Sequence, residues 1–537
     1  MYHHHLLLTL IALLTTLTAE AEGQTQAANA PRNGVPRVVV NILIDQLRSD
    51  YLEAFAPLYG QDGFKRLLEK GCVFSAAEYP LANPDRASAA ATISTGTTAA
   101  DHGIVGMYWM NRETLRPMYC VEDRTVRGRV TTDQYSPKWL NVSTVSDELK
   151  VATDGEARVY SIAPNADEAI LAAGHAADYV VWIDDQTGFW ASTSYYGNMP
   201  YGNMPAWADY RNSRHSLEQR LKDLVWRPSS NEVGAYSYFL ARTPEKPFQH
   251  EFNGNRRYIS YKTSGLVNEE VAATACMAIE TSELGDDAVT DYLAITLYAG
   301  NFEHQPVSAM PLEMQDTYVR LDRAIASIIS SIEKKTGTEG ALVTVTSTGY
   351  TEEGSADLSK FRIPTGTFDM TRATSLLGMY LVAVYGQGNY IESTYGTEIY
   401  LNHKVLEDKQ INISECQSRT QDFLLQLSGV KDVFTSQRLL QGAWTPGISR
   451  MRGGFNPQRS GDVSIQVLPG WRIKTTDPNA PVKISRESYV AFPIIFYGTG
   501  VEAEKNPVEA SVDRIAPTLS KAMRIRAPNA CTKAPLR

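Results

Sequence analysis

The sequence contains few cysteines, no run of basic residues and only one long apolar stretch, which lies at its N-terminus. Its formal net charge is -9, whereas a nucleic-acid partner requires a basic surface that neutralises phosphates. Charge therefore argues against nucleic acid as the partner. Beyond the N-terminal stretch no segment is apolar enough to cross a bilayer, so we expect no membrane span in the mature chain.

The five cysteines are Cys72, Cys120, Cys276, Cys416 and Cys531. Their wide and irregular spacing matches neither a zinc ribbon nor a C-x-x-C redox motif. In an oxidising compartment they can form one or two disulfides, and at least one cysteine is then left over. The spacing does not say which residues pair.

The N-terminal apolar stretch is LLLTLIALLTTL, residues 6–17, and a small-residue A-x-A pattern follows it at residues 19–21. This arrangement is typical of a secretory signal and is too short for a mature transmembrane helix. We therefore predict a signal peptide over residues 1–21 and a flexible leader over residues 22–36. The predicted location is the periplasm, or the cell surface and extracellular space.

Strand-like and helix-like segments alternate along the remaining chain, which predicts an α/β fold with a mostly parallel central sheet and helices on both faces. The expected strands are Arg37–Ile44, Ala157–Ile162, Tyr179–Ile183, Tyr292–Leu297, Ala341–Thr346, Met379–Tyr385, Val463–Val467 and Phe492–Tyr497. The expected helices are Asp50–Lys70, Val267–Glu283, Leu312–Lys335, Glu415–Leu427 and one after Val512. We predict a single domain over residues 37–537, with inserted lid segments at about 186–265 and 351–460.

Several long segments resemble the alkaline phosphatase superfamily, in the branch of the nucleotide pyrophosphatases/phosphodiesterases and the phosphate-irrepressible alkaline phosphatases. The matching text includes VNILIDQLRSDYL (Val40–Leu52), TISTGTTAADHGIVG (Thr92–Gly106), DTYVRLDRAI (Asp316–Ile325), RSGDVSIQVLPGW (Arg459–Trp471) and FPIIFYG (Phe492–Gly498). The resemblance implies hydrolysis of phosphate esters. In the family two zinc ions, held by six Asp or His side chains, activate a threonine or serine nucleophile and stabilise the leaving oxygen.

Carried over position by position, the resemblance leaves this chain without most of those groups. Asp45 and His304 remain at metal-ligand positions, and the other four are occupied by Gly300, Thr348, Gly349 and Ala491. A shifted Asn301 is the one alternative donor near Gly300. Two side chains cannot make a closed tetrahedral zinc site. No metal is therefore confidently assigned, and no cofactor is expected unless the protein is an active enzyme with an altered site, which would use zinc.

The positions for the nucleophile and for phosphate binding differ in the same way. The nucleophile position, nine residues before Thr95, is Arg86. A guanidinium stays protonated and has no lone pair to attack phosphorus, so no catalytic residue is assigned. The phosphate-contacting positions hold Met107, Asn165 and Asp167 in place of an asparagine, a lysine and an arginine. A carboxylate at the arginine position reverses the local charge.

Several of these residues have structural alternatives. Asp45 is interpreted either as a relic of the metal site or as a strand-end carboxylate that caps the following segment or accepts from backbone N–H groups. His304 is either a relic or a satisfied histidine at the surface or in a pocket, because it lacks its co-ligands. For Arg86 we favour an ion pair with Asp45, because a buried carboxylate needs a nearby cation.

Two further features are compatible with a ligand site that differs from the family's. The carboxylates of Glu303, Glu352 and Glu353 are a less favoured set of calcium or magnesium ligands together with Asp45. The stretch YYGNMPYGNMPAW (Tyr195–Trp207) is either an aromatic ligand platform or packing of the inserted segment.

Three functions follow from these observations. The first is an exported, non-catalytic binding or scaffold protein whose partner is an unknown envelope protein, a glycan or a peptide. The second is an active phosphomonoesterase or phosphodiesterase with an altered metal site. The third is a structural subunit whose former active-site face is a protein interface.

Overall fold

The computed structural model describes residues 34–197, 204–234, 247–352, 365–477, 482–485 and 490–537. The predicted signal peptide, residues 1–21, lies outside these ranges. Within them, no helix has the length and apolar character needed to span a membrane. The five cysteines are all described, and each is a free thiol.

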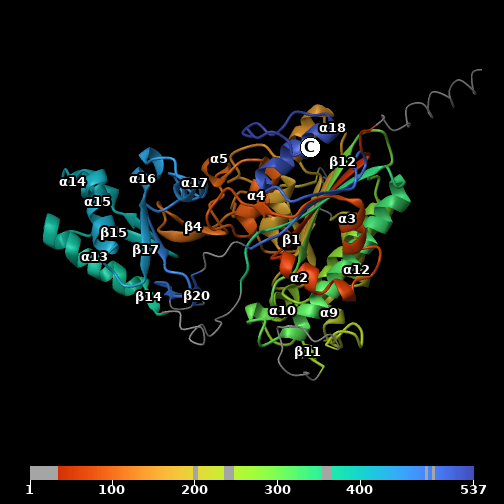
Figure 1. Ribbon diagram of the computed structural model, residues 1–537, viewed down its shortest axis with the longest axis horizontal. Coiled ribbons are helices and arrows are strands. Elements are labelled where there is room, and N and C mark those ends of the chain that lie inside the picture. Colours follow the sequence, from red (N-terminus) through yellow and green to blue (C-terminus); the bar gives the residue numbers. More distant parts are fainter. Residues whose placement is uncertain (1–33, 198–203, 235–246, 353–364, 478–481, 486–489) are drawn as a thin grey trace, which may run out of the picture.

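A ten-stranded sheet forms the centre of the molecule, in the order β22-β2-β21-β13-β1-β12-β7-β8-β9-β6 (Figure 1). Its middle strand β1 (Val38–Asp45) is buried along its whole length and pairs in parallel with β12 (Asp291–Tyr298) and β13 (Ala341–Ser347). Strands β7 (Val159–Ala163) and β8 (Tyr179–Ile183) continue the parallel set. The sheet is therefore mixed but mostly parallel, and the predicted fold class is confirmed.

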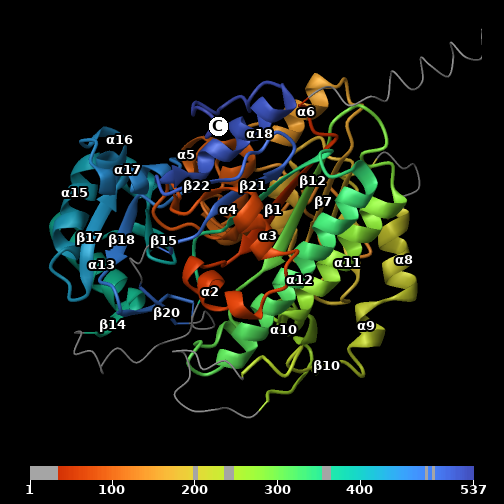
Figure 2. The same ribbon diagram turned by 45° about the vertical axis from the view of Figure 1, so that its right-hand side comes forward.

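Helices cover both faces of this sheet because the side chains of β1 alternate between two apolar layers. Val40 and Ile42 pack with α11 (Leu266–Thr281) and α12 (Pro311–Thr336), which lie side by side in Figure 2. Val39 and Leu43 pack in the opposite layer. That layer contains α4 (Arg86–Thr95), α7 (Ala166–Ala173) and α18 (Ile515–Met523).

The remaining elements of this part are short. The helices are α2 (Ser49–Ala54), α3 (Phe64–Lys70), α5 (Ala99–His102), α6 (Val145–Ala152), α8 (Ala206–Arg214), α9 (Leu217–Arg220) and α10 (Arg257–Lys262). The strands are β2 (Cys72–Phe74), β3 (Ala77–Glu78), β4 (Tyr108–Asn111), β5 (Arg116–Tyr119), β6 (Gly128–Arg129), β9 (Trp190–Thr193), β10 (Val225–Trp226), β11 (His250–Glu251), β21 (Ile494–Gly498), β22 (Glu504–Asn506) and β23 (Ala510–Ser511).

A smaller unit lies at the left of Figure 1 and has its own apolar cluster. Its four-stranded sheet has the order β15 (Ile391–Tyr395), β16 (Glu398–Leu401), β18 (Val463–Val467) and β17 (Val430–Thr435). A second sheet contains β14 (Thr367–Asp369), β19 (Arg472–Lys474) and β20 (Lys483–Ile484). Its helices are α13 (Met370–Tyr385), α14 (His403–Asp408), α15 (Ile413–Leu424), α16 (Ser436–Gln441) and α17 (Pro446–Gly453).

The predicted strand Met379–Tyr385 is wrong, because these residues form the second half of α13. Its apolar run resembles a buried strand, but the buried side chains Ala373, Leu377 and Leu381 recur every four residues. The side chain of Asp369 caps the helix by accepting a hydrogen bond from the backbone N–H of Arg372.

The predicted helix Asp50–Lys70 is also interrupted, between α2 and α3. The buried carboxylate of Asp322 on α12 accepts hydrogen bonds from the backbone N–H groups of Gly60, at 2.9 Å, and Phe64, at 2.7 Å. A Cβ atom at Gly63 would lie 2.2 Å from Asp322 Oδ1. This contact fixes a loop where local propensity alone favours a continuous helix.

Candidate functional site

The expected site lies where the parallel strands of the central sheet end. Strand β1 ends at Asp45, which is in register with Tyr298 at the end of β12, and β13 ends at Ser347. The loop after β7 leads into α7, and α4 packs against α7. In open α/β sheets this edge is the usual place for a ligand site.

Asp45 is buried and accepts hydrogen bonds from two side chains. Thr348 Oγ1 donates to Asp45 Oδ1 at 2.9 Å, and Gln46 Nε2 donates to Asp45 Oδ2 at 3.3 Å. Burial raises the pKa of Asp45 to about 6, against the opposing effect of the positive charge of Arg86. Thr348 stands at a position where the family resemblance expects a metal ligand. In this structure its hydroxyl instead donates a hydrogen bond to Asp45, which occupies another of the metal-ligand positions.

Arg86 forms its ion pair with Asp167, so the predicted pairing with Asp45 is wrong. The distance from Arg86 Nε to Asp167 Oδ2 is 2.8 Å, and the side chains are 26% and 0% exposed respectively. Arg86 is the first residue of α4 and Asp167 is in the first turn of α7, so the packing of these helices brings them together. Burial lowers the pKa of Arg86, but the charges of Asp167, Tyr119 and Glu168 together more than offset this effect, so the pKa is raised.

The residues beside Arg86 are occupied by helix capping. Asp85 Oδ1 accepts a hydrogen bond from the backbone N–H of Ser88 at 2.9 Å, and Asp85 Oδ2 accepts one from the backbone N–H of Met107 at 2.6 Å. Ser88 Oγ returns the capping interaction by accepting from the backbone N–H of Asp85. Ser88 is therefore a capping residue, and Met107 is fixed through its backbone.

Glu168 is a member of this site that the sequence reasoning missed. Its Oε2 accepts a hydrogen bond from Asn165 Nδ2 at 2.8 Å. Within the described residues, Glu168 Oε1 and Asp167 Oδ1 are buried without a hydrogen-bond partner. Burial, and next the charge of Asp45, raise the pKa of Glu168 well above its ordinary value. Adjacency to Asp167 was the only signal in the sequence.

The space that two of the expected metal ligands would need is filled by other side chains. A Cβ atom at Gly349, which has a φ of +71°, would lie 2.6 Å from the ring of Tyr79. A Cβ atom at Gly300 would lie 2.5 Å from Tyr298 Oη. Real Cβ atoms do not approach other atoms so closely, so neither position accommodates a ligand side chain without repacking of its neighbours.

The other candidate ligands do not converge. Asn301 Nδ2 donates to the backbone oxygen of Gln305 at 2.7 Å, so Asn301 does not replace the ligand expected at Gly300. His304 Nδ1 lies 3.4 Å from Glu352 Oε2, and the His304 side chain is about half exposed. Ala491 is exposed, and its backbone oxygen accepts from Ser49.

The other two proposed acidic ligands do not complete a set with Glu352 and Asp45. Glu303 accepts a hydrogen bond from Ser260 at 2.6 Å, while Glu353 lies outside the described residues. Among the residues that are placed, no three His, Cys, Asp or Glu side chains form a group able to hold a metal ion. The donors among the described residues do not fit a two-zinc centre.

The described ends of the aromatic stretch Tyr195–Trp207 pack into the fold. Tyr196 is buried and donates to the backbone oxygen of Gly174 at 2.9 Å. Trp207 is buried with its ring 6.2 Å from that of Tyr160. Residues 198–203 lie outside the described ranges. These contacts match the packing interpretation of the stretch.

Replacing Arg86 with methionine is expected to lower the free energy of unfolding by about 3 kcal/mol, because Asp167 is left buried without a cation. The double variant R86M/D167L should recover most of this loss, because both charges are removed together. Urea unfolding measures both effects.

The matched control is R124M. Arg124 pairs with Glu122 at the surface with its side chain 82% exposed, so its loss should cost less than about 1 kcal/mol. An R86M effect as small as that of R124M would show that the buried pair does not stabilise the fold.

The Asp45→Asn variant should change how stability depends on pH. The folded protein retains a proton on Asp45 up to a pKa of about 6, whereas the unfolded chain loses it near 3.8, so wild-type stability falls as pH rises between these values. The asparagine side chain of the variant would keep an acceptor for Thr348 without this penalty. The variant should therefore gain up to roughly 3 kcal/mol over wild type between pH 4 and pH 7, measured by urea unfolding. A difference that stays constant with pH would contradict this assignment.

The chain matches the model of the family described as type I phosphodiesterase / nucleotide pyrophosphatase over residues 39–489. It is 26% identical to alkaline phosphatase PafA of Elizabethkingia meningoseptica, with 98% of each chain covered. It is 28% identical to a protein of Myroides odoratus named calcium-transporting ATPase, over 92% of this chain and 93% of that one.

The fold is similar to the crystal structure of wild-type alkaline phosphatase PafA. The TM-score is 0.80 at 25% sequence identity, and the similarity covers 95% of this chain and 99% of that one. Sequence and fold agree over nearly the whole length. This protein therefore belongs to the type I phosphodiesterase / nucleotide pyrophosphatase family, within the alkaline phosphatase superfamily.

Proposed function

We propose that this family member binds a ligand at the carboxyl edge of its central sheet and does not hydrolyse phosphate esters by the two-zinc route. The observation that carries the proposal is the ion pair between Arg86 and Asp167. These residues occupy the positions where the family resemblance expects the nucleophile and a phosphate-binding arginine. One pair thus replaces both the attacking group and part of the phosphate site.

The chemistry of these two residues opposes phosphoryl transfer. A guanidinium has five donors and no lone pair, so it cannot attack phosphorus. The carboxylate of Asp167 stands where an arginine would attract a phosphate, and it repels one instead. The filled space at Gly300 and Gly349 supports the same conclusion.

Binding would use the terminal nitrogens of the Arg86 guanidinium, which the ion pair with Asp167 does not occupy. Asp167 accepts from Nε, and the Arg86 side chain is 26% exposed. Its terminal nitrogens donate no hydrogen bond to another described residue. Guanidinium groups bind carboxylate and carbonyl oxygens well. The proposed ligand is therefore a peptide, a glycan or an envelope protein that offers such oxygens.

An active hydrolase with an altered site is the second candidate. The specific observation in its favour is the family match, together with a similar protein that is named an alkaline phosphatase. Under this candidate, zinc or another metal would be held by donors beyond the two retained ones.

Metal content and turnover separate the two candidates. We expect the purified protein, incubated with zinc and desalted, to hold far less than two zinc ions per chain by mass spectrometry. It should show no zinc-dependent hydrolysis of p-nitrophenyl phosphate or bis-p-nitrophenyl phosphate, because four expected ligands are absent.

Asp45→Asn is the matched control for this experiment. Under our proposal it changes neither zinc content nor turnover. Close to two bound zinc ions, with turnover that disappears both on chelation and in D45N, would establish the hydrolase instead.

We further propose that the protein acts outside the cytoplasm, in the periplasm or at the cell surface. The apolar stretch and the small-residue pattern at residues 19–21 support this location. N-terminal sequencing of the protein recovered from its native cells should begin just after Ala21. Recovery of the intact N-terminus from the cytoplasmic fraction would contradict the proposal.

A further inference from the structure

The segment Arg459–Asp462 of the smaller unit contacts the larger unit, which is the part of the chain built on the ten-stranded sheet. It lies between α17 and β18 and opens the family-like stretch RSGDVSIQVLPGW. The chain itself enters the smaller unit between β13 and β14 and leaves it between β20 and β21. Beside the segment, α17 packs against α5 of the larger unit (Figure 2). The segment therefore lies where the two units meet.

Arg459 extends from this segment into the larger unit, where its side chain is buried. Its terminal nitrogens donate to the backbone oxygen of Trp139 at 2.7 Å, to Asn141 Oδ1 at 2.8 Å and to the backbone oxygen of Gly103. Its guanidinium lies 5.0 Å from the ring centre of Trp109 and 5.6 Å from that of Trp139. A Cβ atom at Gly103 would lie 2.3 Å from Arg459 Nη1, so the glycine leaves room for the cation.

No described carboxylate forms an ion pair with Arg459. Burial lowers its pKa to about 10, and the charge is accommodated by oxygen acceptors and indole faces instead. The planar guanidinium holds its donors in a fixed geometry, so its acceptors must stand in matching places. All of these acceptors belong to the larger unit. The arrangement is therefore satisfied only while the two units keep their present orientation.

A second arginine crosses between the units in the opposite direction. Arg112 directly follows β4 of the larger unit, donates to Asp462 Oδ2 at 3.1 Å and lies 4.8 Å from the ring centre of Tyr400 in the smaller unit. Asp462 is buried and is held within the smaller unit by the backbone N–H of Leu401, at 2.7 Å, and by His403 Nε2, at 2.8 Å. Each unit therefore receives one arginine from the other.

The hairpin of β4 and β5 connects this contact to the candidate site. Met107, the residue before β4, donates its backbone N–H to Asp85 Oδ2 at 2.6 Å, and Asp85 directly precedes Arg86. Arg112 follows the other end of β4, and β15 of the smaller unit packs beside this strand. One end of β4 is thus fixed by the N-terminus of α4 and the other end by the smaller unit.

We propose that Arg459 and Arg112 form a clasp that fixes the smaller unit on the larger unit and thereby positions the β4–β5 hairpin beside Arg86. Rotation or sliding of either unit breaks both sets of hydrogen bonds at once. Each break leaves buried oxygen acceptors without a donor, which costs more than the loss of an exposed contact. Both arginines are positioning residues in this role. The clasp does not depend on which ligand the edge of the central sheet binds.

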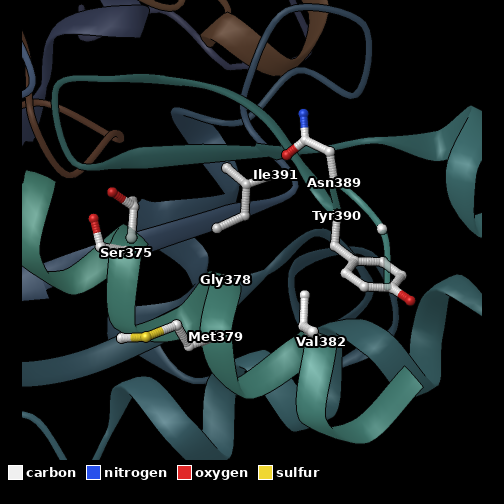
Figure 3. A pocket seen from close by; sticks show the side chains of 9 residues that line it. Ser375, Gly378, Met379, Val382, Asn389, Tyr390 and Ile391 are labelled. Carbon is white, nitrogen blue, oxygen red and sulfur yellow. The ribbon is translucent and has the colours of Figure 1, made fainter. Parts of the chain in front are cut away.

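Double electron–electron resonance measures how the two units are oriented in the full chain. Spin labels coupled to p-acetylphenylalanine replace Met379 and Val508, so the five free thiols are left unlabelled. Met379 is 62% exposed and lines an open groove of about 480 Å³ beside α13 of the smaller unit, which leaves room for a label (Figure 3). Val508 is 66% exposed between β22 and β23 of the larger unit. Hydrogen exchange of peptides that cover β4 follows the hairpin in the unlabelled protein.

The clasp variants are R459M and R112M, and the matched control is R438M. Methionine keeps much of the apolar stem of arginine but removes its donors. Arg438 also forms an ion pair, with Asp432 at 2.7 Å, and lies 4.6 Å from the ring centre of Phe434, but these partners belong to the smaller unit. Its loss therefore weakens the smaller unit without touching the clasp. Thermal unfolding checks that each variant is folded.

We expect one narrow distance distribution in wild type and R438M, and a distribution at least about twice as wide in R459M and R112M, because the units are then free to shift. Exchange at β4 should be at least about tenfold faster in both clasp variants and unchanged in R438M.

Two results would overturn the clasp, namely a wild-type width in the folded clasp variants or an equal widening in R438M. Arg112 is partly exposed, so R112M should fold and decides alone if R459M does not fold. A wider distribution with unchanged exchange at β4 would overturn the positioning of the hairpin beside Arg86.

Discussion

Parallel pairing of β1 with β12 and β13 is the constraint on which the candidate site depends. It places Asp45, Tyr298 and the loop after Ser347 at one edge of the sheet, whatever side chains those loops carry. The same pairing buries every residue of β1 between two helical layers. A strand-end carboxylate at this place is therefore surrounded by protein. Its neighbours must satisfy it, because water has little access.

The neighbours do so in two ways. Arg86 and Asp167 neutralise each other through an ion pair, so the buried carboxylate of Asp167 is compensated by a partly buried cation. Asp45 instead accepts hydrogen bonds from Thr348 and Gln46. Its pKa is still raised, because these bonds do not fully offset the cost of burying the charged carboxylate. The result is an edge at which an ion pair and side-chain hydrogen bonds connect β1, β13, α4 and α7.

The sequence allowed the fold class and most strands of the central sheet to be predicted, because buried parallel strands form continuous apolar runs with Asp45 directly after the first. It also identified Arg86 and Asp167 as unusual at their positions. Their pairing was not predictable, since they are 81 residues apart and meet only through the packing of α4 on α7. Glu168 and the rings around Gly349 were missed for the same reason. The error at α13 arose because an apolar run fits both a strand and a buried helix.

The close contact between Gly349 and Tyr79 restricts which side chain position 349 can carry. Any larger residue there would require Tyr79, whose hydroxyl donates to the backbone oxygen of Ser347, to leave its place first. That displacement breaks a buried hydrogen bond before any new contact is gained. The positive φ of Gly349 adds a backbone cost for any residue with a Cβ atom. The packing of the fold therefore favours glycine at position 349.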